Sequence, residues 1–323
     1  MALIVLTSAS GAPGVTSAAV GLTLTWHRSV LLVDGDPGAH QAILAGYLGG
    51  QLATGKGLQR VAEAHRDRRS LLEVVSDETV PLTAVDHARD GGSPAKDSRA
   101  SARGPSRRLL PGFARPANAG LFGPVWPELA DTFVRLENAG IDVIVDAGRM
   151  DRQGLPQPLV DRADLVLLAT RSNLRSLASA RSYAALLREQ SRLTGMEANL
   201  GVLVVGEGMP YRSKEIGRLL EVPVVCVLPD DPATAAAFSD GTRRSRRFDR
   251  SPLVRALRQA VTDLTGQVRR RRGRLGLDED AEAVPTQAAV EADPAAEPAE
   301  AAATEPLTVN AWLQTGAGGG DRG

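Results

Sequence analysis

Cysteine, lysine and aromatic residues are scarce in this chain of 323 residues. Its one cysteine, Cys226, lies in an apolar run, which excludes an internal disulfide and a cysteine-based metal site. Aromatic residues make up 3% and hydrophobic residues 43%, so Val, Leu and Ala must fill the core. No run of about 18 apolar residues occurs, so we expect no membrane-spanning segment. A cytoplasmic location fits these features.

Net charge is also lacking, because Lys+Arg and Asp+Glu both number 38. The charges are nevertheless segregated along the chain. Positive charge clusters between Arg243 and Arg274, whereas every charged residue from Asp278 to Glu305 is acidic. The arginine cluster is either a solvated helix end or a surface for phosphates of DNA. No aromatic residues are interleaved for base stacking, so only non-specific phosphate contact is expected.

Six apolar runs without polar alternation indicate strands that are buried on both faces, as in a parallel sheet. Segments with helical periodicity separate them, at 16–26, 127–139, 174–194 and 252–269. This order predicts a doubly wound α/β domain over residues 1–272, with helices on both faces of a mostly parallel sheet. The runs are Leu3–Leu6, Val30–Val33, Ile141–Val145, Leu165–Thr170, Leu200–Val205 and Val222–Leu228.

Two segments have compositions unlike that of a packed domain. Residues 87–108 are rich in Ser, Gly, Arg and Pro, and predict a mobile surface insertion. Residues 273–323 are rich in Ala, Pro and Gly, with charges that are mostly acidic, and predict a disordered tail. The final residues, TGAGGGDRG, are unsuited to an amphipathic helix, so we expect no membrane insertion.

A glycine-bearing loop, ASGAPGVTS at residues 9–17, follows the first predicted strand and precedes a helix. Loops in this position bind phosphates, because their backbone N–H groups converge and the helix dipole favours an anion. Thr16 or Ser17 would place a hydroxyl near Mg²⁺. Against the pattern G-x-x-x-x-G-K-[ST], however, Ala9 replaces the first glycine and Val15 replaces the lysine. Taken alone, the loop fits an ordinary strand-to-helix turn equally well.

Three aspartates follow strands whose carboxyl ends should meet at one edge of the sheet. Asp34 and Asp36 end the second strand in LLVDGDPG, and Asp146 ends IDVIVDAGR. Ligands of open parallel sheets bind at this edge. Three carboxylates beside a threonine-bearing loop predict a site for Mg²⁺ and phosphate.

Together these motifs resemble the ParA/MinD family of deviant P-loop ATPases, over most of residues 1–270. The family's K-G-G-x-G-K-[ST]-[ST] loop aligns with Ser10, Gly11, Ala12, Pro13, Gly14, Val15, Thr16 and Ser17. Its D-x-D-P motif aligns with Asp34–Pro37, and a strand ending in Asp aligns with 141–146. Further similar segments are LLPGFARPA at 109–117, ADLVLLATRSNLRSLASA at 163–180 and VPVVCVLPDDPATAAAF at 222–238.

The resemblance implies ATP with Mg²⁺ as the cofactor and assigns roles by position. Thr16 would coordinate Mg²⁺, and Asp34 and Asp146 would orient the water shell of the metal. Asp36 would position or activate the attacking water, as the catalytic residue of any remaining hydrolysis. The aligned loop would hold the phosphates, and Pro229 and Asp230 would lie beside the base.

Two departures affect catalysis. The family's signature lysine is Ser10 here, and its P-loop lysine is Val15. Phosphoryl transfer depends on neutralising charge, so losing both cations predicts weak nucleotide binding and very slow hydrolysis or none. Arg149 could be a compensating cation, or a solvated loop arginine.

Three functions therefore stay open. The first is a ParA/MinD-like protein of spatial organisation, in chromosome partitioning, septum placement or secretion and pilus assembly. Its degenerate ATP site would leave it to act through protein partners, with a homodimer possible. The second is a slow Mg-ATPase with relocated cations. The third is a non-specific DNA-binding module that uses the arginines of 243–274.

Overall fold

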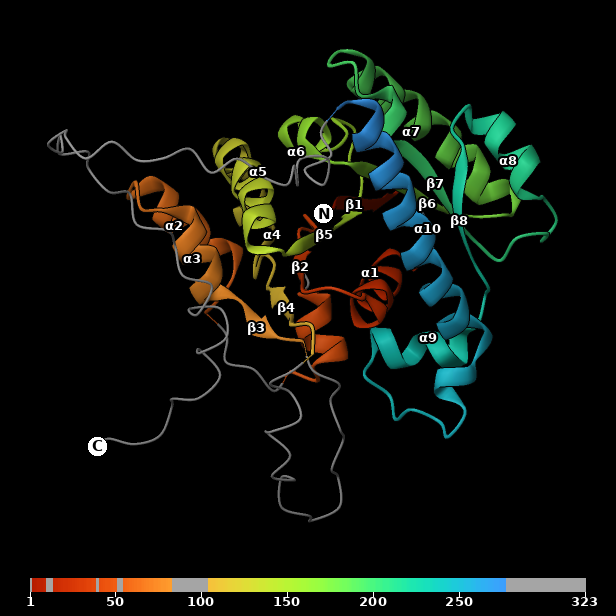
Figure 1. The fold of residues 1–323 in the computed structure, drawn as a ribbon, viewed down its shortest axis with the longest axis horizontal. Helices are drawn as coiled ribbons and strands as arrows, with labels where there is room; N and C mark the ends of the chain where they lie inside the picture. The colour runs from red at the N-terminus through yellow and green to blue at the C-terminus, as the bar shows by residue number, and fades with distance from the viewer. Residues whose placement is uncertain (1, 10–13, 39–40, 51–54, 83–103, 277–323) are drawn as a thin grey trace, which may run out of the picture. The chain divides into compact units, whose positions relative to one another are not determined.

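The structure, a computed structural model, describes residues 2–9, 14–38, 41–50, 55–82 and 104–276. Residues 1–271 form one compact unit, and only residues 272–276 of the remainder are described. An eight-stranded sheet with the order β3-β4-β2-β5-β1-β6-β7-β8 runs through this unit (Figure 1). Its strands are β1 Leu3–Ser8, β2 Val30–Asp34, β3 Val80–Pro81, β4 Arg107–Leu110, β5 Asp142–Arg149, β6 Leu165–Arg171, β7 Leu200–Val205 and β8 Val224–Leu228.

All strand pairs are parallel except β3 with β4. Helices connect the strands, as parallel pairing requires. They are α1 Val15–Thr25, α2 Leu58–Arg66, α3 Leu71–Glu78, α4 Pro116–Gly120, α5 Trp126–Arg135, α6 Gln157–Arg162, α7 Leu174–Arg192, α8 Ser213–Leu220, α9 Pro232–Ser239 and α10 Pro252–Arg274. A π-helical segment, Ile43–Tyr47, follows β2. Among the described residues, no helix is both long and apolar enough to cross a membrane.

The central strand β1 is buried on both faces. Ile4 and Leu6 pack into a core cluster with residues of α1, α9 and α10. Val5, whose side chain alternates with theirs, is also fully buried. The apolar runs thus form parallel strands covered on both sides, which confirms the predicted fold class. On the α10 side, the missing side chain of Gly21 lets α1 approach Leu257 closely.

Strands β3 and β4 were not predicted, and β4 corrects one predicted boundary. The proposed insertion at 87–108 ends too late, because Arg107 and Arg108 lie in β4. Arg107 donates to the carbonyl oxygens of Thr23 and Trp26, at 3.1 and 2.9 Å. Arg108 donates to the carbonyl oxygen of Thr79 at 3.0 Å. Residues 87–103 lie outside the described part of the chain.

Two predicted helices have different ends in the structure. The segment at 127–139 divides into α5 and a 3₁₀ turn, Leu136–Ala139. The segment at 252–269 continues to Arg274, so the tail begins later than residue 273. Tail residues 277–323 lie outside the described residues.

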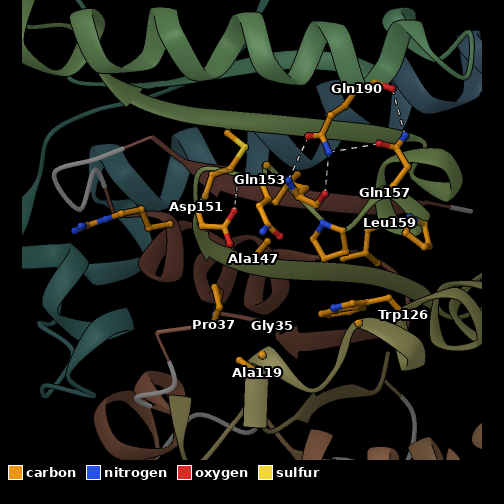
Figure 2. A pocket seen from close by; sticks show the side chains of 18 of the residues that line it. Gly35, Pro37, Ala119, Trp126, Ala147, Asp151, Gln153, Gln157, Leu159 and Gln190 are labelled. Atoms are coloured by element: carbon orange, nitrogen blue, oxygen red, sulfur yellow. Dashed lines mark hydrogen bonds between the residues drawn. The ribbon is translucent and has the colours of Figure 1, made fainter. Parts of the chain in front are cut away.

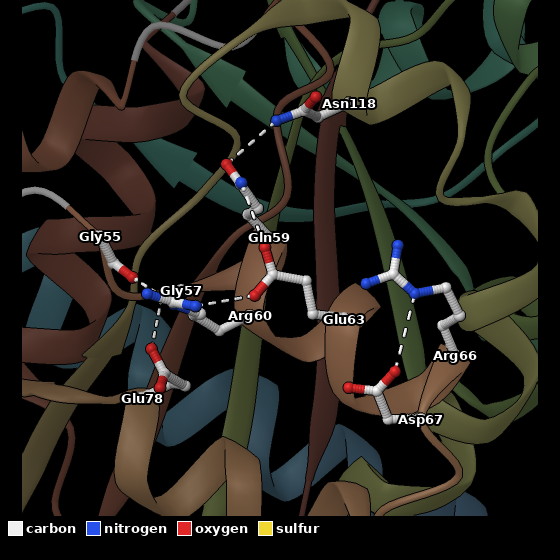
Figure 3. Close-up of polar contacts among 9 residues, drawn as sticks. All are labelled: Gly55, Gly57, Gln59, Arg60, Glu63, Arg66, Asp67, Glu78 and Asn118. Carbon is white, nitrogen blue, oxygen red and sulfur yellow. Dashed lines mark hydrogen bonds and ion pairs between the residues drawn. The ribbon is translucent and has the colours of Figure 1, made fainter.

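Helix α2 is attached to the segment that follows β4, and Figure 3 shows one of the contacts, in which Asn118 donates a hydrogen bond to Gln59 of α2. Leu58 N donates to Pro111 O at 2.9 Å, and Gly57 N donates to the Glu78 carboxylate at 3.1 Å. Gly57 has φ 110°, and a Cβ there would lie 2.2 Å from Pro111 O. These contacts fix the residues after β4, which lie against the acidic site described next.

Candidate functional site

Asp34 and Asp146 lie side by side at the carboxyl edge of the sheet. They are register partners in the parallel strands β2 and β5. Gly35 N donates to Asp146 O at 2.8 Å, which holds the two strand ends together. Gly112 packs so closely that a Cβ there would lie 2.5 Å from Asp34 O. Both carboxyl groups are therefore placed by the sheet, and the segment after β4 packs against Asp34.

Thr16 connects the start of α1 to this acidic pair. Its hydroxyl donates a hydrogen bond to the Asp146 carboxyl group, and Gly148 N donates to Asp146 Oδ1 at 3.0 Å. The N-cap of α1 is Gly14, with φ 92° and no side-chain cap. The first N–H groups of a helix have no intrahelical acceptors, so the end of α1 presents donors at this edge.

Asp36 forms the third part of the acidic cluster. Its Oδ1 accepts a hydrogen bond from Gly38 N at 2.7 Å. Gly148 has φ 58°, and a Cβ there would lie 2.2 Å from Asp36 Cγ. The carboxyl group of Asp36 thus rests against the backbone that also contacts Asp146.

Burial and mutual repulsion shift the pKa values of these carboxyls. Burial, then the charges of Asp146 and Asp36, raises the pKa of Asp34 from 3.8 to about 8. Burial raises the pKa of Asp146 to about 6, although hydrogen bonds from Thr16 and Gly148 oppose that rise. Asp34 Oδ2 and Asp146 Oδ2 are buried and have no hydrogen-bond partner. Such unpaired buried oxygens cost free energy unless a ligand satisfies them.

The oxygen donors of this cluster suit Mg²⁺, which accepts one or two carboxylates together with phosphate oxygens and water. Within the described residues, no three Asp, Glu, His or Cys side chains are grouped so that they could hold a metal ion by themselves. The cluster therefore fits magnesium that arrives with a phosphate ligand, and does not form a complete metal cage.

The phosphate-loop prediction is only partly within the described residues. Ser10, Gly11, Ala12 and Pro13 lie outside them. Val15, which occupies the position of the family's lysine, is buried in the core cluster beside β1. Its side chain carries no charge and contributes packing only.

A cavity of about 260 Å³ joins the start of α1 to the loop after β8. Gly14 and Ser17 line it on one side, and Pro229 and Asp230 line it on the other. The structure thus brings together the two segments that the resemblance assigns to nucleotide binding. Arg171, at the end of β6, also lines this cavity and was missed in the sequence. Its only sequence signal is a charged residue directly after a buried apolar strand.

A second cavity, of about 460 Å³, lies beside the strand ends of β2 and β5 (Figure 2). Pro37, Ala147 and the exposed Arg149 line it, with Trp126 contributing an apolar wall. Gln190 reaches from α7 to its rim, where it accepts from Leu155 N and donates to Leu155 O at 2.9 Å. Arg149 therefore lines this cavity, and is absent from the described lining of the cavity beside Gly14.

Comparisons with known proteins rest on structure alone, because no protein-family model and no curated protein sequence matches this chain. A chain of the MinC:MinD cell division protein complex from Aquifex aeolicus matches with a TM-score of 0.58 and 18% identity. That match covers 82% of this chain and 96% of that one. A ParA family ATPase from Chlorobium tepidum TLS matches with a TM-score of 0.59 and 16% identity, covering 81% and 98%.

The septum site-determining protein MinD from Pyrococcus horikoshii OT3, complexed with Mg-ADP, matches with a TM-score of 0.51 and 17% identity. The match covers 81% of this chain and 95% of the Pyrococcus chain. This chain therefore has the P-loop NTPase-like fold of the MinD and ParA family ATPases.

Proposed function

We propose that this chain is a ParA/MinD-like protein of spatial organisation that binds a magnesium nucleotide and acts mainly through contacts with partner proteins. The observation that carries the proposal is the buried acidic pair, Asp34 and Asp146, beside Thr16 at the start of α1. Two buried carboxyls that each leave one oxygen without a hydrogen-bond partner weaken a fold. Magnesium that binds together with a phosphate group would supply the missing positive charge, and its bound waters would supply the hydrogen-bond donors.

The described residues can assume defined roles in this site. Thr16 would contribute its hydroxyl to the metal, and Asp34 and Asp146 would hold the waters around it. Magnesium, when bound, neutralises phosphate charge. Asp36 lies at the outer side of the cluster, where its carboxylate can orient a water. Pro229 and Asp230 border the side of the 260 Å³ cavity where the nucleoside would lie, and Gly14 and Ser17 border the side nearer the phosphates.

Hydrolysis is proposed to be very slow or absent. Charge neutralisation dominates phosphoryl transfer, and a missing trans-acting cation costs about 10³–10⁵ in rate by analogy with arginine fingers. Val15 is buried in the core and offers no charge. The same reasoning makes nucleotide binding weak relative to a site with both lysines.

Partners follow from the fold by analogy. One neighbour comes from a MinC:MinD complex, in which a protein of this fold assembles with another protein. We extend that mode of action to this chain, in the cytoplasm, with septum placement, chromosome partitioning or secretion and pilus assembly as the candidate processes. A homodimer is compatible with it.

Calorimetric titration with Mg-ADP and Mg-ATP, together with phosphate release, tests the proposal. We expect saturable binding and turnover at least about 10³-fold below the ~10 s⁻¹ typical of enzymes. Asp36→Asn is the control, because turnover that it leaves unchanged comes from a contaminant. The absence of binding at millimolar nucleotide would refute the proposal. Turnover at the typical rate that Asp36→Asn abolishes would instead establish an active Mg-ATPase with relocated cations.

Non-specific DNA binding is a second candidate, favoured by exposed arginines before α10. Arg243, Arg246 and Arg247 are exposed, while Arg244 stacks over Phe248 at 4.8 Å. Phosphate contacts by such residues weaken steeply as salt rises. Duplex DNA binding that falls with salt would support this function, and binding indifferent to salt would count against it.

A further inference from the structure

We propose that Arg171 supplies positive charge to the phosphates of the bound nucleotide, by exchanging its partner Asp230 for a phosphate group. The inference rests on the proposed function and assigns the cation that its phosphate loop lacks. It concerns a residue that the motif alignment does not assign to the site.

The position of Arg171 is set by the central strands. It is the last residue of β6, which pairs with β1 so that Ala169 is opposite Ser8, where the phosphate loop begins. Its side chain lines the cavity that Gly14 and Ser17 border at the start of α1. A guanidinium group at this place faces the same space as the uncapped N–H groups of the helix.

The charges around the cavity make a single cation important. Three carboxylates line it, from Asp230, Asp231 and Asp240, and Arg171 is the one basic residue in its described lining. Without that cation, a phosphate group entering the cavity would meet negative charge only. Arg171 therefore decides whether this side of the site can accept an anion.

Two of the three carboxylates are already occupied by neighbours. Asp231 caps α9, accepting from Thr234 N at 3.1 Å and Thr234 Oγ1 at 2.7 Å. Asp240 accepts from Ser239 Oγ at 2.8 Å. The remaining one, Asp230, pairs with Arg171, with 2.6 Å between the guanidinium and carboxylate atoms.

This ion pair is suited to partner exchange. The side chains of Arg171 and Asp230 are 35% and 30% exposed, and pairs open to water are weak. A phosphate carries more charge than a carboxylate and accepts two parallel guanidinium hydrogen bonds. A nucleotide can therefore displace Asp230 as the partner of Arg171.

The backbone around the pair is held in place, so the exchange needs only side-chain rotation. Ser172 is buried, and its hydroxyl donates to Gly206 O and accepts from Met209 N at 3.0 Å. Gly206 N in turn donates to Leu228 O at 2.9 Å, directly before the loop that carries Asp230. The ends of β6, β7 and β8 thus form a fixed frame for a mobile guanidinium.

The test compares nucleotide with nucleoside. Wild type, Arg171→Gln and Arg175→Gln are titrated by calorimetry with Mg-ADP and with adenosine. Arg175, exposed in the first turn of α7, is the matched control. Losing a charge-assisted hydrogen bond should weaken Mg-ADP binding about 10- to 100-fold in Arg171→Gln. Adenosine should bind within about threefold of wild type in both variants, because it has no phosphate.

Two results would overturn the inference while leaving the proposed function intact. In the first, wild type binds Mg-ADP and Arg171→Gln binds it equally well. In the second, Arg171→Gln loses affinity for Mg-ADP and for adenosine to the same extent. Failure of wild type to bind Mg-ADP would refute the proposed function itself.

A structural explanation is tested with two further variants and with urea unfolding of each protein. Asp230→Asn removes the same ion pair but keeps the guanidinium. Because Asp230 also borders the nucleoside side of the cavity, its effect is read as the affinity for Mg-ADP relative to that for adenosine, and this ratio should be at least as high as in wild type. Arg171→Lys keeps the charge and should retain more Mg-ADP affinity than Arg171→Gln. Equal losses in Asp230→Asn and Arg171→Gln would show that the pair only supports the fold, and would refute the exchange.

Discussion

Asp34 is expected to weaken the ligand-free fold, so that replacing it with asparagine stabilises the protein at high pH. Its pKa rises from 3.8 to about 8 in the folded state. Because the folded pKa is the higher one, the folded state keeps a proton that the unfolded state has lost. The stabilisation from that proton is full below about pH 4 and is lost as the pH rises through about 8.

The size of the effect follows from two opposing terms. A pKa change from 3.8 to about 8 corresponds to on the order of 5 kcal/mol between low and high pH. The amide introduced by Asp34→Asn would bring its own unsatisfied polar atoms, at about 1–3 kcal/mol. We therefore expect Asp34→Asn to raise the free energy of unfolding by roughly 2–4 kcal/mol above about pH 8. Near pH 5 the variant should be no more stable than wild type.

Urea unfolding at about pH 5 and about pH 8.5 measures the free energy of unfolding of Asp34→Asn and of wild type at each pH. Asp142→Asn is the matched control, because Asp142 is equally buried yet accepts from Ala2 N at 2.8 Å and Trp26 Nε1 at 2.7 Å. It should destabilise the protein at both pH values. The reasoning is refuted if Asp34→Asn changes stability by the same amount at both, because the carboxyl then carries no pH-dependent cost.

Three other changes test separate parts of the account. Gly148→Ala should weaken Mg-ADP binding at least about tenfold in a calorimetric titration, because the new Cβ would meet the Asp36 carboxyl. Gly208→Ala is the control: Gly208 also has a positive φ, of 80°, but a Cβ there would meet open space, so binding should not change. Trp26→Phe should lower the free energy of unfolding by about 1–3 kcal/mol in urea, because the carboxylate of Asp142 loses a donor. Deleting residues 276–323 should strengthen duplex DNA binding in a mobility shift if the acidic tail competes for the arginines, and unchanged binding would exclude that competition.

The acidic site could be located from the sequence because the topology of the sheet largely determines where its aspartates lie. Asp34 and Asp146 each end a continuous apolar run, and parallel strands bring their carboxyl ends to one edge. Register then makes the two residues neighbours. Their unpaired oxygens and raised pKa values could not be foreseen, since these depend on burial in the folded protein, to which the segment after β4 contributes at Asp34.

Strand β4 could not be predicted because its first two residues are arginines. A charged pair normally argues against a buried strand. Here the guanidinium of Arg107 reaches the end of α1 and that of Arg108 reaches Thr79, so both charges find acceptors far away in sequence. Burial lowers the pKa of both groups. Only tertiary structure supplies those acceptors.

The choice of compensating cation shows the same limit. Arg149 follows Asp146 closely in sequence and was therefore the natural candidate. The structure places it on the cavity that Trp126 lines, whereas Arg171 lines the cavity beside Gly14. The arginine beside the start of α1 is determined by the order of the strands, in which β5 and β6 lie on either side of β1. Local sequence does not reveal that order.

The central claim is that Asp34, Asp146 and Thr16 form a binding site for magnesium that carries a phosphate ligand. Calorimetric titration of wild type and Asp146→Asn with ADP, in Mg²⁺ and in EDTA, tests it most directly. Mg²⁺ should strengthen ADP binding by wild type at least about tenfold, and this gain should disappear in Asp146→Asn. Equal binding by wild type with and without Mg²⁺, or a gain that survives in Asp146→Asn, would contradict the claim.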